Sequence, residues 1–130
     1  MHELGIVQKI VAAADKAAEK NNIAHVKVLR LRLGQMAAAH PDQMQFGFET
    51  YAKGSRLEGA KLCIEDVKVE LQCQRCSQKF GDPRFDDHEF AHTMAHAPIA
   101  YMAPRCPKCN AENPKIIHGQ ELELVEIEGE

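Results

Sequence analysis

Two Cys-x-x-Cys pairs, Cys73 with Cys76 and Cys106 with Cys109, constrain this chain more than any other feature. Each pair can form a tight turn that points both thiolates at one ion, and two such turns complete the tetrahedron that zinc prefers. Four thiolate ligands leave no coordination position open, which indicates a structural site rather than a catalytic one. Two redox dithiols or reduced free thiols are the alternative, but the paired spacing favours a four-cysteine zinc site.

The segment that contains these pairs, residues 72–114, differs from the rest of the chain. It holds four of the five cysteines and three of the seven histidines, and it has too few apolar residues to fold unaided. Zinc binding worth on the order of 10–16 kcal/mol is enough to organise such a segment. The fifth cysteine, Cys63, lies in an apolar stretch and is predicted to be a small buried core residue rather than a ligand.

Outside this segment, hydrophobic periodicity predicts regular secondary structure. The first helix is amphipathic, and Pro41 fits the first turn of the second helix. The last strand changes its alternation part-way, which predicts a bulge or an edge position. The predicted elements are helices over 4–20 and 41–53 and strands over 25–33, 61–71 and 120–128.

We therefore expect an α+β fold, with two helices on a small three-stranded mixed sheet. The last strand returns to pair with the first two, and the cysteine-rich segment is inserted as a zinc-ribbon-like domain. Residues 1–71 and 115–130 form the α+β domain in this interpretation. Residues 72–114 form the zinc-binding domain, with a long inserted loop over 77–105.

Charge and hydropathy exclude several classes of function. The net charge of −3 gives no electrostatic footprint for nucleic acid, and four thiolates around one zinc ion add about −2 more. No stretch approaches the roughly 18 apolar residues of a membrane span, and charged residues interrupt the N-terminal apolar stretch where a signal peptide needs none. A cytoplasmic protein is expected, and in that reducing compartment paired cysteines are metal ligands more often than disulfides.

The loop between the cysteine pairs carries His88, His92 and His96 at four-residue spacing. The stretch HEFAH matches the H-E-x-x-H pattern, in which two histidines on one helix face bind zinc and the glutamate, here Glu89, acts as a general base. A solvated helical turn without a metal role and an auxiliary nickel- or zinc-binding patch are the two other interpretations.

The context of this stretch argues against a peptidase. Such a site needs a long helix buried beside a substrate-binding sheet. Here the stretch is bounded by Pro83 and Pro98, and it offers only Phe90 and Met94 for burial. An enzyme is therefore not expected.

The chain begins Met-His-Glu, before the helical apolar pattern starts at Leu4. The free α-amine of Met1, the deprotonated backbone nitrogens of residues 2 and 3 and the imidazole of His2 can chelate one divalent cation in a plane. Ni(II) and Cu(II) favour this arrangement, and zinc does not. Glu3 can add a carboxylate oxygen or orient the ring. Such an exposed site suits delivery of a metal better than storage.

Several stretches together resemble the HypA/HybF family of nickel metallochaperones for [NiFe]-hydrogenase maturation. The likeness covers nearly the whole chain apart from the segment between the cysteine pairs, and it is carried by MHELGIVQKIV, LRLRLGQMAAAHPDQMQFGFETYAKGS, the two Cys-x-x-Cys pairs and QELELVEIE. The resemblance implies a metal carrier without catalytic turnover. It implies nickel bound through Met1, His2 and Glu3 in the α+β domain, and zinc bound by Cys73, Cys76, Cys106 and Cys109.

The resemblance also implies partners. These are the maturation GTPase HypB and the hydrogenase large-subunit precursor. Neither nucleic acid nor a membrane is expected as a partner, and homodimerisation is left open.

The 29 residues over 77–105 amount to an insertion relative to the family. His40 stands where some relatives carry an acidic residue, so it joins His88, His92 and His96 as an auxiliary metal candidate. A residue at the start of the second helix is the simpler interpretation of His40. A zinc-ribbon protein-interaction module is the alternative function.

Overall fold

The computed structural model describes residues 2–37, 39–96 and 102–130, and for residues 2 and 3 it gives the backbone only. The chain divides into two compact units. The first unit comprises residues 1–32, 39–65 and 123–130, and the second comprises residues 33–38 and 66–122. The second unit thus takes in residues on both sides of the predicted boundaries at 71 and 115. The assignment of nickel and zinc binding to separate domains stays a prediction.

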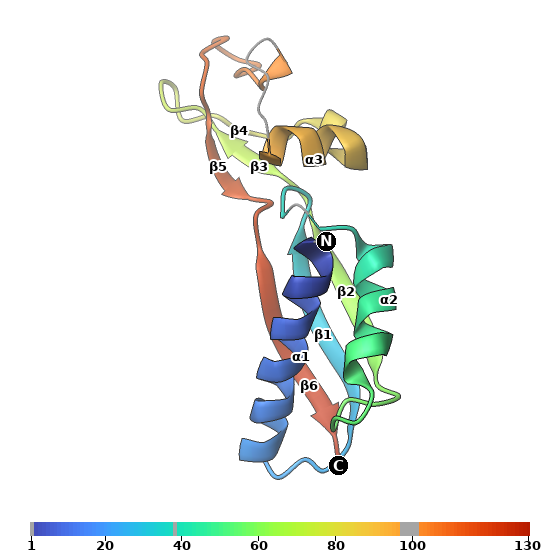
Figure 1. Cartoon of the computed structure of the whole chain (residues 1–130). Coiled ribbons are helices and arrows are strands. Elements are labelled where there is room, and N and C mark those ends of the chain that lie inside the picture. Colours follow the sequence, from blue (N-terminus) through green and yellow to red (C-terminus); the bar gives the residue numbers. More distant parts are fainter. Residues whose placement is uncertain (1, 38, 97–101) are drawn as a thin grey trace. The chain divides into compact units, whose positions relative to one another are not determined.

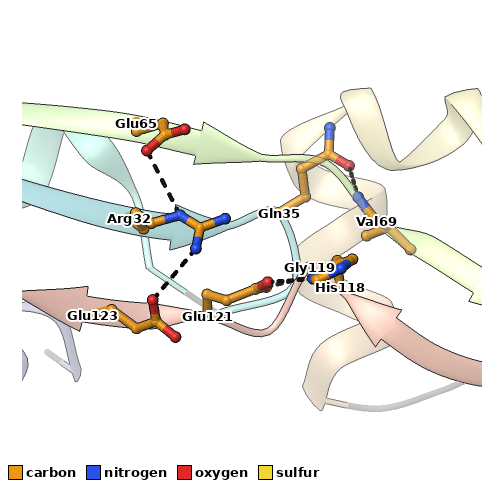
Figure 2. A network of polar contacts seen from close by, with 8 residues as sticks. All are labelled: Arg32, Gln35, Glu65, Val69, His118, Gly119, Glu121 and Glu123. Atoms are coloured by element: carbon orange, nitrogen blue, oxygen red, sulfur yellow. Dashed lines mark hydrogen bonds and ion pairs between the residues drawn. The ribbon is translucent and has the colours of Figure 1, made fainter. Parts of the chain in front are cut away.

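The first unit is a three-stranded sheet with two helices on one face (Figure 1). Its strand order is β2-β1-β6. Strands β1 and β2 point the same way and β6 the opposite way (Figure 2), which confirms the predicted mixed sheet. The last strand pairs with β1 alone, so the expectation that it pairs with both earlier strands is wrong, whereas its edge position is confirmed. The elements are α1 (His2–Lys20), β1 (Val26–Gly34), α2 (Pro41–Ala52), β2 (Lys61–Val67) and β6 (Leu122–Gly129).

The core of the first unit follows the predicted periodicity. Buried residues on α1 recur at spacings of three and four, as an amphipathic helix requires, and the inner face of β1 contributes leucines at alternate positions. Gly47 of α2 lets the helices approach closely, because a Cβ there would lie 2.9 Å from Cδ2 of Leu4. The buried residues include Val7, Val11, Ala14, Ala18, Leu29, Leu31, Met44 and Phe48.

The other face of this sheet carries ion pairs. Arg32 on the central strand lies between Glu65 on β2 and Glu123 on β6 (Figure 2), with N–O distances of 3.6 and 3.5 Å. Arg30 pairs with Glu126 at 3.3 Å in the same way. Exposed pairs of this kind contribute little stability each, about 0–1 kcal/mol. Their glutamates place charge on the edge strand β6, and charge on an edge opposes pairing with further strands.

The predicted strand over 61–71 is wrong as a single element. Strand β2 ends at Val67, and the chain re-enters a different sheet as β3 (Glu70–Gln72). Gln35 holds the break: its backbone N–H donates to the carbonyl of Val67 at 3.0 Å, and its side-chain oxygen accepts from the N–H of Val69 at 2.8 Å (Figure 2). The alternation of apolar residues continues through the break, so the residue pattern carries no signal for it.

In the part of the chain that the structure describes, the second unit contains a small antiparallel sheet, the 3-10 helix η1 (Pro83–Asp86) and the helix α3 (His88–His96). The strand order is β4-β3-β5, and Leu71 of the central strand lies opposite Phe80 and Ile116. The outer strands are β4 (Lys79–Phe80) and β5 (Lys115–His118).

This unit has a hydrophobic core of its own. Ala91 and Met94 of α3 are buried in it, so only the outer face of the predicted solvated helical turn over residues 88–96 is exposed; whether this helix has a metal role stays a prediction. Val69, Leu71, Met36 and Ile116 come from outside residues 72–114, so the apolar residues of that segment pack together with residues from elsewhere in the chain. The buried members are Val69, Leu71, Phe85, Ala91 and Met94, and the partly buried ones include Met36, Phe80, Phe90, Met102 and Ile116.

Two glycines allow the turn between β5 and β6 to pass close to the end of β1. A Cβ at Gly34 would lie 2.1 Å from the carbonyl oxygen of Gly119, and a Cβ at Gly119 would lie 2.9 Å from Cα of Val69. Gly119 also has a φ of +119°, which side chains with a Cβ rarely adopt. The backbone of the crossing is paired, since Gly34 donates to the carbonyl of Glu121 at 2.7 Å.

The carboxylate of Glu121 closes this turn. Its oxygens accept from the backbone N–H of Gly119 at 2.6 Å and contact Nδ1 of His118 at 2.8 Å (Figure 2), and its side chain is only 14% exposed. Burial acts to raise the pKa of Glu121, but the hydrogen bonds from Gly119 and His118 outweigh it and lower the pKa to about 2.

Substitution Glu121→Gln is expected to reduce the free energy of unfolding at pH 7 by about 1–2 kcal/mol. Because the folded-state pKa lies below the unfolded one, the stabilisation is present above about pH 4.5 and is lost as the pH falls toward 2. Urea denaturation of both proteins at pH 7, 4.5 and 3 measures the difference, with zinc content checked at each pH. If the difference in unfolding free energy between the two proteins stayed constant across this pH range, the lowered pKa of Glu121 would be contradicted.

Candidate metal centre

The four cysteine thiols of the two Cys-x-x-Cys pairs come together in the second unit. All four sulfur atoms lie within 4.8 Å of one another. The Sγ atoms of Cys73 and Cys109 are 3.5 Å apart, as are those of Cys76 and Cys106. A tetrahedral ion with bonds of about 2.3 Å needs sulfur atoms about 3.8 Å apart. The cage therefore fits a zinc ion after small movements of the sulfur atoms.

The two turns that carry these cysteines have the same local geometry. Sγ of Cys73 accepts from the backbone N–H groups two and three residues later, at 3.3 and 3.4 Å. Sγ of Cys106 accepts from the equivalent groups, both at 3.4 Å. Such N–H donors favour the charged thiolate over the neutral thiol.

Each turn is closed by a residue with a left-handed backbone. Ser77 and Asn110 have φ values of 65° and 61°. Their N–H groups donate to the carbonyls of Cys73 and Cys106 at 3.0 and 2.8 Å. Asn110 tolerates this conformation better than most residues do, because its short polar side chain can hydrogen-bond to nearby backbone groups. The spacing of the cysteines is thus converted into two matching metal-binding turns.

The electrostatics of the cage favour a bound cation. Hydrogen bonds from the N–H groups of Cys76 and Arg75 lower the pKa of Cys73 to about 6, against the effect of burial. The N–H of Gln78 acts to lower the pKa of Cys76, but burial and the neighbouring thiols outweigh it and raise that pKa to about 11. Without a cation, ionisation of one thiol therefore opposes that of the next. A divalent ion removes this repulsion and allows all four thiolates to form.

Arg75 provides further positive charge beside the cage. Its guanidinium donates to the backbone carbonyl of Cys109 at 2.6 Å, which links the two turns. The pKa of Arg75 is raised, first by a hydrogen bond to the side chain of Cys109 and then by the charge of that side chain. The contact offsets part of the negative charge that four thiolates around one divalent ion carry.

Cys63 is not a member of this cage; it belongs to β2 of the first unit. It is half-buried rather than buried, so the prediction of a core position is wrong. It lines an open hollow of about 320 Å³ together with Arg30, Glu65 and Val125. Among the residues that the structure describes, only the four cage cysteines form a group of three or more candidate ligands.

The predicted amino-terminal nickel ligands are described only in part. Met1 lies outside the described residues, and His2 and Glu3 are described by their backbone, which begins α1. The helix therefore starts two residues earlier than the apolar pattern suggested. His40 precedes α2 in an extended conformation, and its carbonyl accepts from the N–H of Met44 at 2.9 Å.

The three histidines of the insertion lie on α3. The rings of His92 and His96 are in contact, with centroids 4.4 Å apart. Helix α3 is nine residues long, far shorter than the helix that an H-E-x-x-H peptidase site needs. Nothing among the described side chains adds a third ligand to the histidines.

Comparisons with known proteins assign the chain to a family. A family model described as "Hydrogenase/urease nickel incorporation, metallochaperone, hypA" matches residues 1–129. The chain belongs to the HypA family. It is 37% identical over 130 residues to hydrogenase maturation factor HypA of Roseiflexus sp. (strain RS-1), covering 100% of this chain and 93% of the relative. Its identity to the HypA of Chloroflexus aurantiacus (strain ATCC 29366 / DSM 635 / J-10-fl) is 34% over 128 residues, with 98% of each chain covered.

Solved HypA structures have the same fold. One solution structure of a HypA protein aligns with a TM-score of 0.65 and 28% identity, covering 99% of this chain and 96% of the other. The solution structure of the Ni metallochaperone HypA from Helicobacter pylori aligns with a TM-score of 0.61 and 26% identity, covering 98% and 96%. The predicted α+β fold and family resemblance are confirmed.

Membership of the HypA family identifies the chain as a maturation factor of the nickel metallochaperone family and not an enzyme. The structure adds a four-cysteine metal site to that assignment. None of the helices in the described part of the chain is both long and apolar enough to cross a membrane.

Proposed function

We propose that this chain carries Ni(II) to a hydrogenase under maturation and binds it through the amino group of Met1, His2 and Glu3. The family description, which names nickel incorporation, supports the carrier role. Nitrogen donors arranged in a plane suit Ni(II), and an exposed chelate can pass its ion to a second protein. Micromolar affinity corresponds to only about 8 kcal/mol, which a recipient site can overcome.

The start of α1 at His2 is the observation that carries this proposal. The first four N–H groups of an α-helix have no partner within the helix. The backbone nitrogens of residues 2 and 3 can therefore lose their protons to a metal without breaking the hydrogen-bond ladder of α1. The rest of the helix is fixed by its buried face, so the chelating residues extend from a rigid support.

Zn(II) is the ion we assign to the cysteine cage. Four thiolates at tetrahedral spacing suit zinc, whereas Ni(II) prefers a planar set of nitrogen or oxygen ligands. The cage joins two turns that are 29 residues apart in the chain, over 77–105. Its role in this proposal is to hold the second unit together while nickel binds elsewhere.

The partners are proposed on the family assignment. A hydrogenase maturation factor acts on other proteins of that process, and we propose HypB and the large-subunit precursor as the proteins it meets in the cytoplasm. Nucleic acid and membranes are not proposed as partners, because the net charge of −3 opposes binding to polyanions. Homodimerisation stays a prediction.

A nickel titration of the chain with four glycines added before Met1 tests this function. The added residues place the amine too far from His2 to form the proposed chelate, while the rest of the chain is unchanged. A single added glycine is unsuitable, because Gly-Met-His would itself offer an amine, two backbone nitrogens and an imidazole in a plane to Ni(II). We expect the native chain to bind one nickel ion at roughly micromolar concentration, by equilibrium dialysis with metal analysis. The extended chain should lose that ion and keep its zinc.

A chain with four glycines added after Glu130 is the matched control and should bind nickel like the native protein. Unchanged nickel affinity in the chain extended before Met1 would show that the amino-terminal site is wrong.

A further inference from the structure

Helix α3 is held in place by its apolar face. Ala91 and Met94 are 1% and 5% exposed and pack in the core of the second unit. Phe90 adds an edge-to-face contact with Phe85, with ring centroids 5.1 Å apart. The helix start is fixed as well, because the carboxylate of Asp87 accepts from the N–H of Glu89 at 3.1 Å.

His92 and His96 lie outside that apolar face, one helical turn apart. His92 is half-buried and His96 is exposed. Their rings meet with centroids 4.4 Å apart and an angle of 63° between the planes. Residues four apart on a helix are neighbours, and two histidines at this spacing can bind one ion with their ring nitrogens. The anchored helix keeps the rings at this separation before any metal arrives.

We propose that His92 and His96 form a second transition-metal site that binds one divalent ion such as Ni(II). Two neutral imidazoles at about 2.0–2.1 Å supply the protein ligands, and water completes the coordination. With two protein ligands this site is weaker than the cysteine cage and exchanges its ion readily. It does not depend on the amino-terminal chelate, so either site can exist without the other.

His88 provides a matched control on the same helix. It occupies the equivalent position one turn before His92, but the three histidines do not form a group whose ligand atoms are all within reach of one ion. The ring contact in the structure joins His92 to His96. Substitution of His88 is therefore expected to leave the site in place.

The test uses the full, zinc-loaded chain with four glycines added before Met1, so that the amino-terminal chelate is absent. Ni(II) alone is the probe, measured by equilibrium dialysis and by broadening of the histidine ring signals in ¹⁵N NMR spectra. We expect one weakly bound nickel ion and selective broadening of the His92 and His96 signals. His92→Ala and His96→Ala should each weaken binding roughly tenfold or more, whereas His88→Ala should change it less than about twofold.

Circular dichroism and zinc analysis of each variant show whether the second unit is still folded. The Ala substitutions favour helix formation, so loss of α3 is not expected. Equal nickel binding in the parent and the His92→Ala and His96→Ala variants would overturn the proposal. Loss in the His88→Ala variant as large as in the other two would also overturn it. The same measurements on the chain without the added glycines report the amino-terminal site separately.

Discussion

A His2→Ala substitution is expected to abolish tight nickel binding and to leave zinc content and fold intact. The substitution removes the imidazole from the proposed chelate, and the remaining amine and backbone nitrogens do not hold Ni(II) at micromolar concentration. A loss from micromolar to millimolar affinity corresponds to about 4 kcal/mol. Alanine is a good helix residue, so α1 should remain unchanged. Nickel binding by equilibrium dialysis and zinc by metal analysis measure the two effects on one sample.

His25→Ala is the matched control for this prediction. His25 is an exposed histidine of the same unit, between α1 and β1, and its loss should leave nickel binding unchanged. The experiment is most informative when nickel X-ray absorption accompanies it. A His2→Ala protein whose nickel keeps the same affinity and the same nitrogen ligands would contradict the proposed ligand set.

Cys73→Ser is expected to remove zinc from the chain and to disorder the second unit. Cys73 is buried, and its thiol has the lowered pKa of about 6 within the cage. Zinc binding by such sites is worth on the order of 10–16 kcal/mol, and it becomes folding energy for the segment that it closes. A serine oxygen is a poor substitute for a thiolate toward zinc. Loss of several kcal/mol is therefore expected, enough to unfold the cysteine turns.

Cys63→Ser is the matched control, because Cys63 is a half-buried thiol outside the cage. It should keep one zinc ion and the native amide spectrum. Zinc analysis after dialysis against a chelator, and hydrogen exchange of residues 72–114, distinguish the two variants. Retention of one zinc ion by Cys73→Ser under these conditions, with native protection of that segment, would show that Cys73 is dispensable to the site.

The candidate site could be predicted from the sequence where its chemistry depends on short spacings. Two thiols separated by two residues form a metal-binding turn wherever the chain places them. The same holds for α1, since its buried residues recur at helical spacing within one segment. These features are local, so sequence neighbours determine them.

The break between β2 and β3 could not be predicted in this way. The apolar alternation runs through Val67, Val69 and Leu71, and the residue that holds the break, Gln35, lies more than thirty positions earlier. The burial of α3 could not be predicted for the same reason, because Ala91 and Met94 share a core with Val69 and Leu71 of another segment. Periodicity within residues 88–96 carries no information about these distant partners.

Residue order within short stretches was enough to predict the two cysteine turns, the amphipathic first helix, the strands of the first sheet and the family resemblance. Only the folded backbone shows where the second strand stops, which segments supply the core of the second unit, and that His92 and His96 meet on an anchored helix. The difference lies in the range of the interactions. Metal-binding turns and helix faces are set by residues a few positions apart, whereas a core is formed by side chains that only the folded backbone brings together.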